Sequence, residues 1–185
     1  MKSKIVFWSV VVSFAVACGI HTTASPVCAG TDLYASWVQG NVTQVEYPAR
    51  LGKPKQLHIG WGARFWGKEN TSNWFHIPVT TPVIVENVRT QLKKVFVLFK
   101  TDGDAKVTSV HVYDGDKLIK FFDNLSITGS HMTTDASNTF NVIPNISVRY
   151  GLSLAVRVEF GAKTGSDFAS ILFTSAGVDL NRVTP

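Results

Sequence analysis

Beyond residue 30, the chain alternates between apolar and polar positions, which is the pattern of β-strands with one buried face. The clearest case is the stretch 152–160, where every second residue is apolar and the residues between are small or polar. Its predicted inner face comprises Leu152, Leu154, Val156 and Val158. Lys94–Thr101 is apolar at both parities, which is typical of a strand buried on both faces. No helical period of apolar residues appears beyond the N-terminal segment.

Short runs of β-branched and aromatic residues, bounded by Gly, Asn, Asp or Pro, predict further strands. These runs are Leu33–Val38, Val42–Tyr47, Gln56–Gly60, Val83–Val85, Lys106–Tyr113, Leu118–Asp123 and Ala169–Val178. The segments 48–55 and 124–138 are predicted to be loops. About nine strands at this spacing predict an all-β fold, a single antiparallel β-sandwich of jelly-roll or immunoglobulin-like type over residues 31–185.

Two Asp-Gly-Asp sequences interrupt the central strands, at 102–104 and 114–116. Asp-Gly is a strong hairpin signal, so residues 94–123 are predicted to form a three-stranded meander. The paired carboxylates also resemble partial calcium ligands, but each pair supplies too few oxygens for a site. We therefore expect no metal site at either turn.

The N-terminus has the layout of an export signal. Lys2 and Lys4 precede an almost unbroken apolar run, Ile5–Ala17, and small residues follow. We predict a signal peptide over 1–24, with cleavage between 17 and 29, and hence a secreted or periplasmic/cell-envelope protein. Cys18 is an alternative lipidation site, which would attach the protein to a membrane through a lipid anchor alone.

The composition limits the classes of partner. Hydrophobic residues make up 45% of the chain and charged residues 17%, which suits one domain with a substantial core. The net charge of +5 is scattered along the sequence, so neither a nucleic-acid partner nor a basic membrane-binding tail is predicted.

The richest chemistry lies in the aromatic stretch 58–79, which predicts two strands joined by a polar turn. By strand parity, Phe65 and Phe75 face the core. If the two strands pair, the opposite faces bring together Arg64, Trp66, Trp74 and His76. Indole and guanidinium groups side by side can stack on sugar rings, so these four residues are the predicted ligand-binding set. The alternative is that both tryptophans are ordinary packing residues.

Signals for catalysis are absent from the sequence. There is no Gly-x-Ser-x-Gly elbow and no His-Glu-x-x-His, and the histidines show no ligand spacing. No catalytic residue and no cofactor are predicted. A catalytic triad can assemble from residues that are far apart in the sequence, so a hydrolase stays open as the least favoured function.

The segments Gly60–Asn70, Asn73–Pro78 and Phe173–Leu180 resemble an uncharacterised family of small bacterial secreted or envelope proteins. The resemblance covers about Gly60–Leu180 and implies one β-rich domain, but no activity. The sequence thus favours a non-enzymatic binding module, with a glycan as its expected ligand. The alternative is an assembly protein that pairs with another envelope protein through the same aromatic edge.

Overall fold

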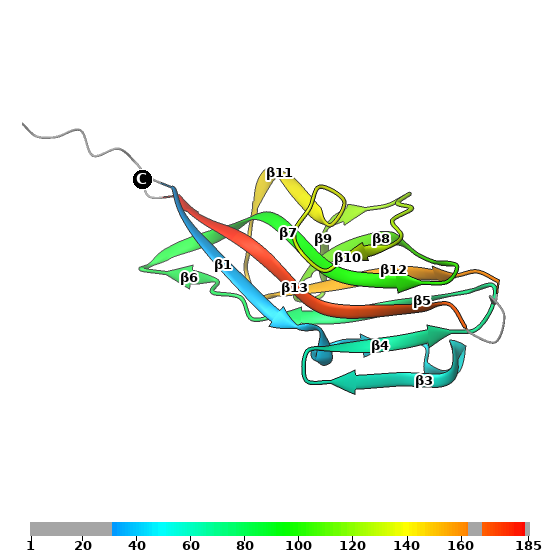
Figure 1. Ribbon diagram of the computed structural model, residues 1–185. Helices are drawn as coiled ribbons and strands as arrows, with labels where there is room; N and C mark the ends of the chain where they lie inside the picture. The colour runs from blue at the N-terminus through cyan, green and yellow to red at the C-terminus, as the bar shows by residue number, and fades with distance from the viewer. Residues whose placement is uncertain (1–30, 163–167, 184–185) are drawn as a thin grey trace, which may run out of the picture.

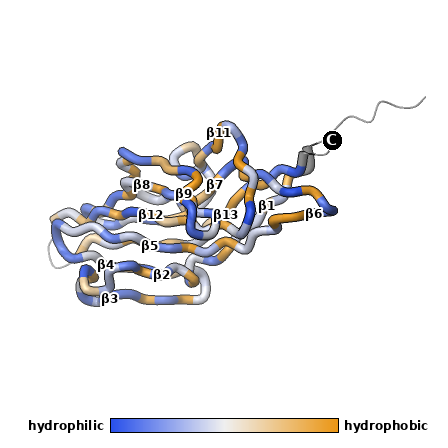
Figure 2. The backbone as a smooth tube through the Cα atoms, turned by 180° about the vertical axis from the view of Figure 1, so that it is seen from behind, coloured by the Kyte–Doolittle hydropathy of each residue, from blue (hydrophilic) through white to orange (hydrophobic). Residues whose placement is uncertain are grey.

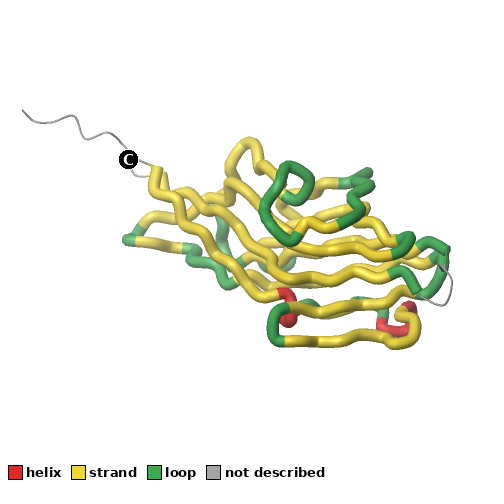
Figure 3. The backbone as a smooth tube through the Cα atoms, in the orientation of Figure 1, coloured by secondary structure: helices red, strands yellow, loops and turns green. Residues whose placement is uncertain are grey.

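The computed structural model describes residues 31–162 and 168–183, and most of this part of the chain is β-strand (Figure 3). Two short 3₁₀ turns, η1 (Gly40–Val42) and η2 (Pro48–Arg50), are the helical elements of the described residues. No helix in the described ranges is long and apolar enough to cross a membrane. The predicted signal peptide, Cys18 and the whole predicted cleavage window lie outside the described residues, which begin at 31.

The strands form two antiparallel sheets (Figure 1). The smaller sheet has five strands in the order β2-β5-β12-β8-β9. Their bounds are β2 Gln44–Val45, β5 Thr71–Val79, β12 Leu152–Phe160, β8 Ala105–Asp114 and β9 Lys117–Phe122. The strand predicted most clearly from the sequence, β12, lies at the centre of this sheet, between β5 and β8.

The larger sheet has eight strands arranged around two long ones, β7 (Val88–Asp102) and β13 (Ser170–Val183). The remaining six are β1 Thr31–Gln39, β3 Leu51–Ile59, β4 Gly62–Gly67, β6 Ile84–Val85, β10 Ser130–His131 and β11 Thr139–Ser147. The first part of β13 pairs with β4 and its remainder pairs with β1, so β1 and β4 follow one another along the same edge of β13.

The core lies between the two sheets. Hydrophobic and hydrophilic residues alternate along most strands (Figure 2), and the buried ones from both sheets form a single cluster. Phe65 on β4 contacts Phe75 on β5, with ring centroids 4.8 Å apart. Leu152, Leu154, Val156 and Val158 are all buried in this cluster, which confirms the predicted inner face of β12.

The aromatic stretch does not form the expected pair of neighbouring strands. β4 belongs to the larger sheet and β5 to the smaller one, and the turn 68–70 carries the chain from one sheet to the other. Gly67 permits this corner because a Cβ there would overlap the ring of Phe160. Asn70 adopts a positive φ of 54°, which asparagine tolerates better than most residues. A polar turn such as 68–70 has the same sequence pattern whether it closes a hairpin within one sheet or connects two sheets, so the sequence does not distinguish the two.

The predicted meander is also wrong at its first turn. Both edges of β7 are occupied, by β13 on one side and by β6, β10 and β11 on the other, so β8 cannot pair with it. The turn at 102–104 instead crosses between the sheets, whereas the turn at 114–116 does connect the paired strands β8 and β9. The segment 48–55, predicted as a loop, contains η2 and the start of β3, and β11 was not predicted.

Candidate functional site

The four predicted ligand-binding residues lie in two pairs on opposite sides of the molecule. Arg64 and Trp66 alternate with buried Phe65 on β4, so they lie on the outer face of the larger sheet. Trp74 and His76 alternate with buried Phe75 on β5, on the outer face of the smaller sheet. The expectation that all four share one surface is wrong, because it required β4 and β5 to pair.

On the smaller sheet, Trp74 is part of an aromatic row whose residues come from three strands. Its ring lies 4.7 Å from the ring of His111 on β8, and His111 lies 6.2 Å from Phe121 on β9. Ala155 on the intervening strand β12 is opposite His111 in the register and is buried although it faces outward. The small alanine therefore leaves room for the indole to reach His111. We call Trp74, His111 and Phe121 the aromatic row; Phe121 is 59% exposed.

Carboxylates hold the two histidines of this face. His111 Nε2 lies 2.8 Å from Asp123 Oδ1, and this hydrogen bond lowers the pKa of Asp123. On the other side of Ala155, His76 Nε2 lies 2.9 Å from Glu46 Oε2. The pKa of Glu46 is lowered chiefly by its hydrogen bond with the Tyr47 side chain and additionally by His76. Both carboxylates are therefore ionised near neutral pH and fix the two imidazole rings, His111 within the row and His76 beside it.

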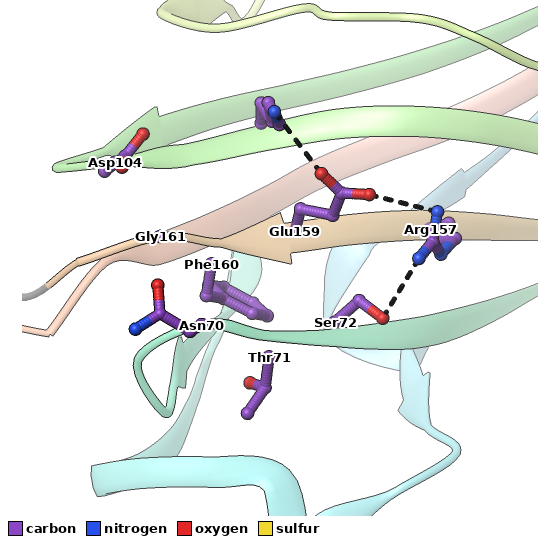
Figure 4. Close-up of a pocket in the computed structure, with 9 residues that line it drawn as sticks. Asn70, Thr71, Ser72, Asp104, Arg157, Glu159, Phe160 and Gly161 are labelled. Carbon is purple, nitrogen blue, oxygen red and sulfur yellow. Dashed lines mark hydrogen bonds and ion pairs between the residues drawn. The ribbon is translucent and has the colours of Figure 1, made fainter.

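A network of ion pairs lies next to the aromatic row. Glu159 Oε1 is 3.1 Å from Arg157 Nη1, and Glu159 Oε2 is 3.3 Å from Lys106 Nζ. Arg157 also donates to Ser72 Oγ at 3.3 Å (Figure 4). Arg157 lies directly opposite Trp74 in the register of β12 and β5. The network is thus adjacent to the indole, and each of its three charged side chains is 35–41% exposed.

Two hollows meet at this network. One, of about 330 Å³, extends from Asn70 and Ser72 to Asp104 (Figure 4). The other, of about 650 Å³, is lined by Trp74, Asp123 and the segment 124–126. Lys106, Arg157 and Glu159 line both, so the two polar hollows adjoin on the outer face of the smaller sheet. We call the two together the outer groove.

The other predicted pair, Arg64 and Trp66, lines a hollow of about 470 Å³ on the larger sheet. Arg64 Nη1 is 2.7 Å from Asp102 Oδ2, and its guanidinium carbon lies 5.8 Å from the centre of the Trp66 ring. Lys100 also pairs with Asp102, at 3.0 Å. Burial would raise the pKa of Asp102, but Lys100 and Arg64 outweigh it and the pKa is lowered. The guanidinium is therefore already engaged by a carboxylate and by an aromatic ring.

The aspartates of the two Asp-Gly-Asp turns have separate structural roles. Asp102 forms the ion pairs just described, whereas Asp114 is buried and accepts three backbone N–H groups, from Arg149, Tyr150 and Gly151. Within the described ranges, no three His, Cys, Asp or Glu side chains cluster in a way that could hold a metal ion.

Sequence reasoning missed most of the outer groove. It placed Arg157 and Glu159 on the polar face of their strand but could not tell which strands flank it. His111 reaches Trp74 only through the pairing of β8 with β12 and of β12 with β5, which is non-local. Phe121 joins His111 through the β8–β9 hairpin, which the sequence did predict. The available signal was the alternation itself: His111 and Arg157 both lie on the polar side of otherwise apolar strands.

These features define a class of protein: a β-rich domain of two antiparallel sheets with an aromatic and charged groove on one outer face. Residues 32–183 match a family of unknown function, DUF6623, and the chain belongs to that family. The match confirms the resemblance to an uncharacterised domain family and spans more of the chain than the segments that suggested it. No curated protein matches this sequence.

Proposed function

We propose that this chain is a secreted or envelope-anchored, non-enzymatic binding module of the β-sandwich type, and that its ligand is a carbohydrate. The export assignment rests on the N-terminal charge and apolar run. The binding assignment rests on the outer groove. Two facing sheets that share one core support the sandwich type.

The observation that carries the proposal is the position of the half-buried Trp74 indole, beside His111 and bordering a groove of about 650 Å³. A sugar ring has an apolar face of C–H groups and a rim of hydroxyls. An indole at a groove wall offers a flat apolar surface to the first, while carboxylate, guanidinium and ammonium groups form hydrogen bonds with the second.

The charges of the groove favour an uncharged sugar. Lys106 and Arg157 both pair with Glu159, and Asp123 is engaged with His111. A strongly charged ligand would have to break one of these pairs, whereas hydroxyl groups can donate to and accept from the partners while the pairs remain intact. His76, beyond Ala155, borders the same face.

A glycan array probed with the exported protein tests the proposal. We expect binding to a group of neutral glycans that share a terminal or repeating unit, and no dependence on sulfate or carboxylate groups. Binding that requires acidic sugars would contradict the neutral-ligand argument, and an array without any bound glycan would contradict the carbohydrate proposal.

Export itself is a separate prediction. The mature protein should begin between residues 18 and 30, because the cleavage machinery recognises small residues that follow the apolar run. Intact-mass analysis of protein recovered from outside the cytoplasm checks this, and a lipidated Cys18 would add the mass of its acyl chains. Recovery of exported protein that still carries Met1 would contradict the prediction.

Assembly through the aromatic strands is the less favoured proposal. β4 lies between β13 and β3, and β5 lies between β2 and β12, so neither is the outermost strand of its sheet.

A further inference from the structure

An open strand edge lies elsewhere, at β1. This nine-residue strand pairs with β13 along one side, and no other strand in the described part of the chain pairs with it. The unpaired backbone groups of such an edge are a template for pairing with another chain. Natural proteins usually protect long edges with lysine, proline or bulges, or keep the edges short.

The other edge strands of this protein carry such protection. β3 has Lys53, Pro54 and Lys55, β9 has Lys117 and Lys120, and β11 contains Pro144. β2, β6 and β10 are two residues long. Among the edge strands that the structure describes, β1 is the only long one that contains neither lysine nor proline. Its single charged residue is Asp32.

Three of the exposed side chains of β1 are apolar, at positions where edge protection would place charges. Leu33 is 55% exposed and Trp37 is 41% exposed, and Ala35 between them is also exposed. Trp37 is held in place by Phe96, whose ring centroid is 5.1 Å away, and lies over Gly177, where a Cβ would overlap its ring. The three residues share one face of the strand by parity.

This face is complementary to itself. We propose that β1 pairs antiparallel with β1 of a second copy, with the two-fold axis at Ala35. In this register residue 33 is opposite residue 37 of the other copy, so Leu33 and Trp37 lie opposite one another twice on the same face, with each indole backed by Phe96 of its own copy. All nine residues are paired, and the two Asp32 residues lie at opposite ends of the strand pair. The two larger sheets would then join into one continuous sheet, and the outer grooves would remain open.

The contact is modest in size. Pairing of two nine-residue strands buries on the order of 1,000 Å² in total, near the lower limit for a specific interface, so we expect a dimer that dissociates in the micromolar range. The inference is independent of the ligand of the outer groove.

Sedimentation of the exported protein over a concentration series tests the dimer, and two variants test its register. Ala35→Lys places two ammonium groups directly opposite one another, and like charges there oppose pairing. We expect this variant to be monomeric, and Ala35→Glu likewise. An equimolar mixture of the two should recover the dimer, because only this register places residue 35 against itself. Leu118→Lys, at an exposed position of β9, is the matched control and should leave the dimer unchanged.

A wild-type protein that stays monomeric into the high micromolar range would overturn the proposal. That is the result expected if residues preceding β1 cover this edge. A dimer that survives Ala35→Lys, or a mixture that fails to recover it, would also overturn it. Melting temperatures of both Ala35 variants near that of wild type are expected, since the side chain is exposed.

Discussion

Replacing Val156 with aspartate is expected to unfold the domain. Val156 has no exposed surface and lies opposite Phe75 on β5 and Val110 on β8, both also fully buried. A carboxylate there has no hydrogen-bond donor within the apolar cluster, and burial of an unpaired charge costs several kcal/mol. That cost is comparable with the ~5–15 kcal/mol by which a domain is usually stable.

Thermal unfolding followed by circular dichroism measures this effect. Ser153→Asp on the same strand is the matched control, because Ser153 faces outward between Pro78 and Tyr113 and is partly exposed. We expect the control to change stability by roughly 0.5 kcal/mol or less. If Val156→Asp melted within a degree or two of wild type, the inner face of β12 and the two-sheet core would be wrongly assigned.

The second large effect is expected at Asp114. Its two carboxylate oxygens accept the backbone N–H groups of Arg149, Tyr150 and Gly151 at 2.6, 2.8 and 3.0 Å, which fixes the turn between β11 and β12. Asn in this position would direct an NH₂ group at a backbone donor. We therefore expect Asp114→Asn to lower the free energy of unfolding by about 2–4 kcal/mol, since hydrogen bonds to a charged group are stronger than neutral ones.

Acid should remove the same stabilisation. Burial alone would raise the pKa of Asp114, but the three N–H donors outweigh it and lower the pKa. A lowered pKa in the folded protein contributes stability that is present above the unfolded value of about 3.9 and is lost as the pH falls through the folded value. The difference between wild type and Asp114→Asn should therefore be largest near neutral pH and should shrink below about pH 4.

Denaturant titrations at several pH values check both statements. Asp116→Asn is the control, because Asp116 is exposed in the neighbouring turn and should contribute little. Equal stabilities of the two variants at neutral pH would contradict the anchoring role of Asp114. So would a stability difference that does not change with pH.

The sequence predicted local structure well and pairing poorly. The alternation in β12 follows from burial on one face of the strand, and the double apolar pattern of β7 follows from burial on both. In each case the polarity of single residues is enough to predict the burial. The two Asp-Gly-Asp turns look the same in the sequence, yet one closes a hairpin and the other crosses between sheets. That difference depends on which strand edges are already paired with other strands. The strand that pairs with such an edge can lie far away in the sequence, as β13 does from β7.

The candidate site shows the same division. Parity alone identified Trp74 and His76 as outward-facing, and their side chains are partly exposed as expected. It also placed Arg64 and Trp66 outward, but could not reveal that the corner at Gly67 puts them on the opposite side of the molecule. The groups that now surround Trp74, namely His111 and Arg157, are separated from it by many residues and meet it only through strand register.

The most direct test of the carbohydrate-binding proposal compares two tryptophans that the structure places on opposite outer faces. With the glycan that the array selects, Trp74→Ala should weaken binding about tenfold, because one stacked ring contributes on the order of 1 kcal/mol. Trp66→Ala, on the larger sheet, should leave the affinity unchanged. Affinity and melting temperature should be measured on both variants. Binding that depends on Trp66 but not on Trp74, or a Trp74→Ala variant that is unfolded, would contradict the outer groove as the binding site.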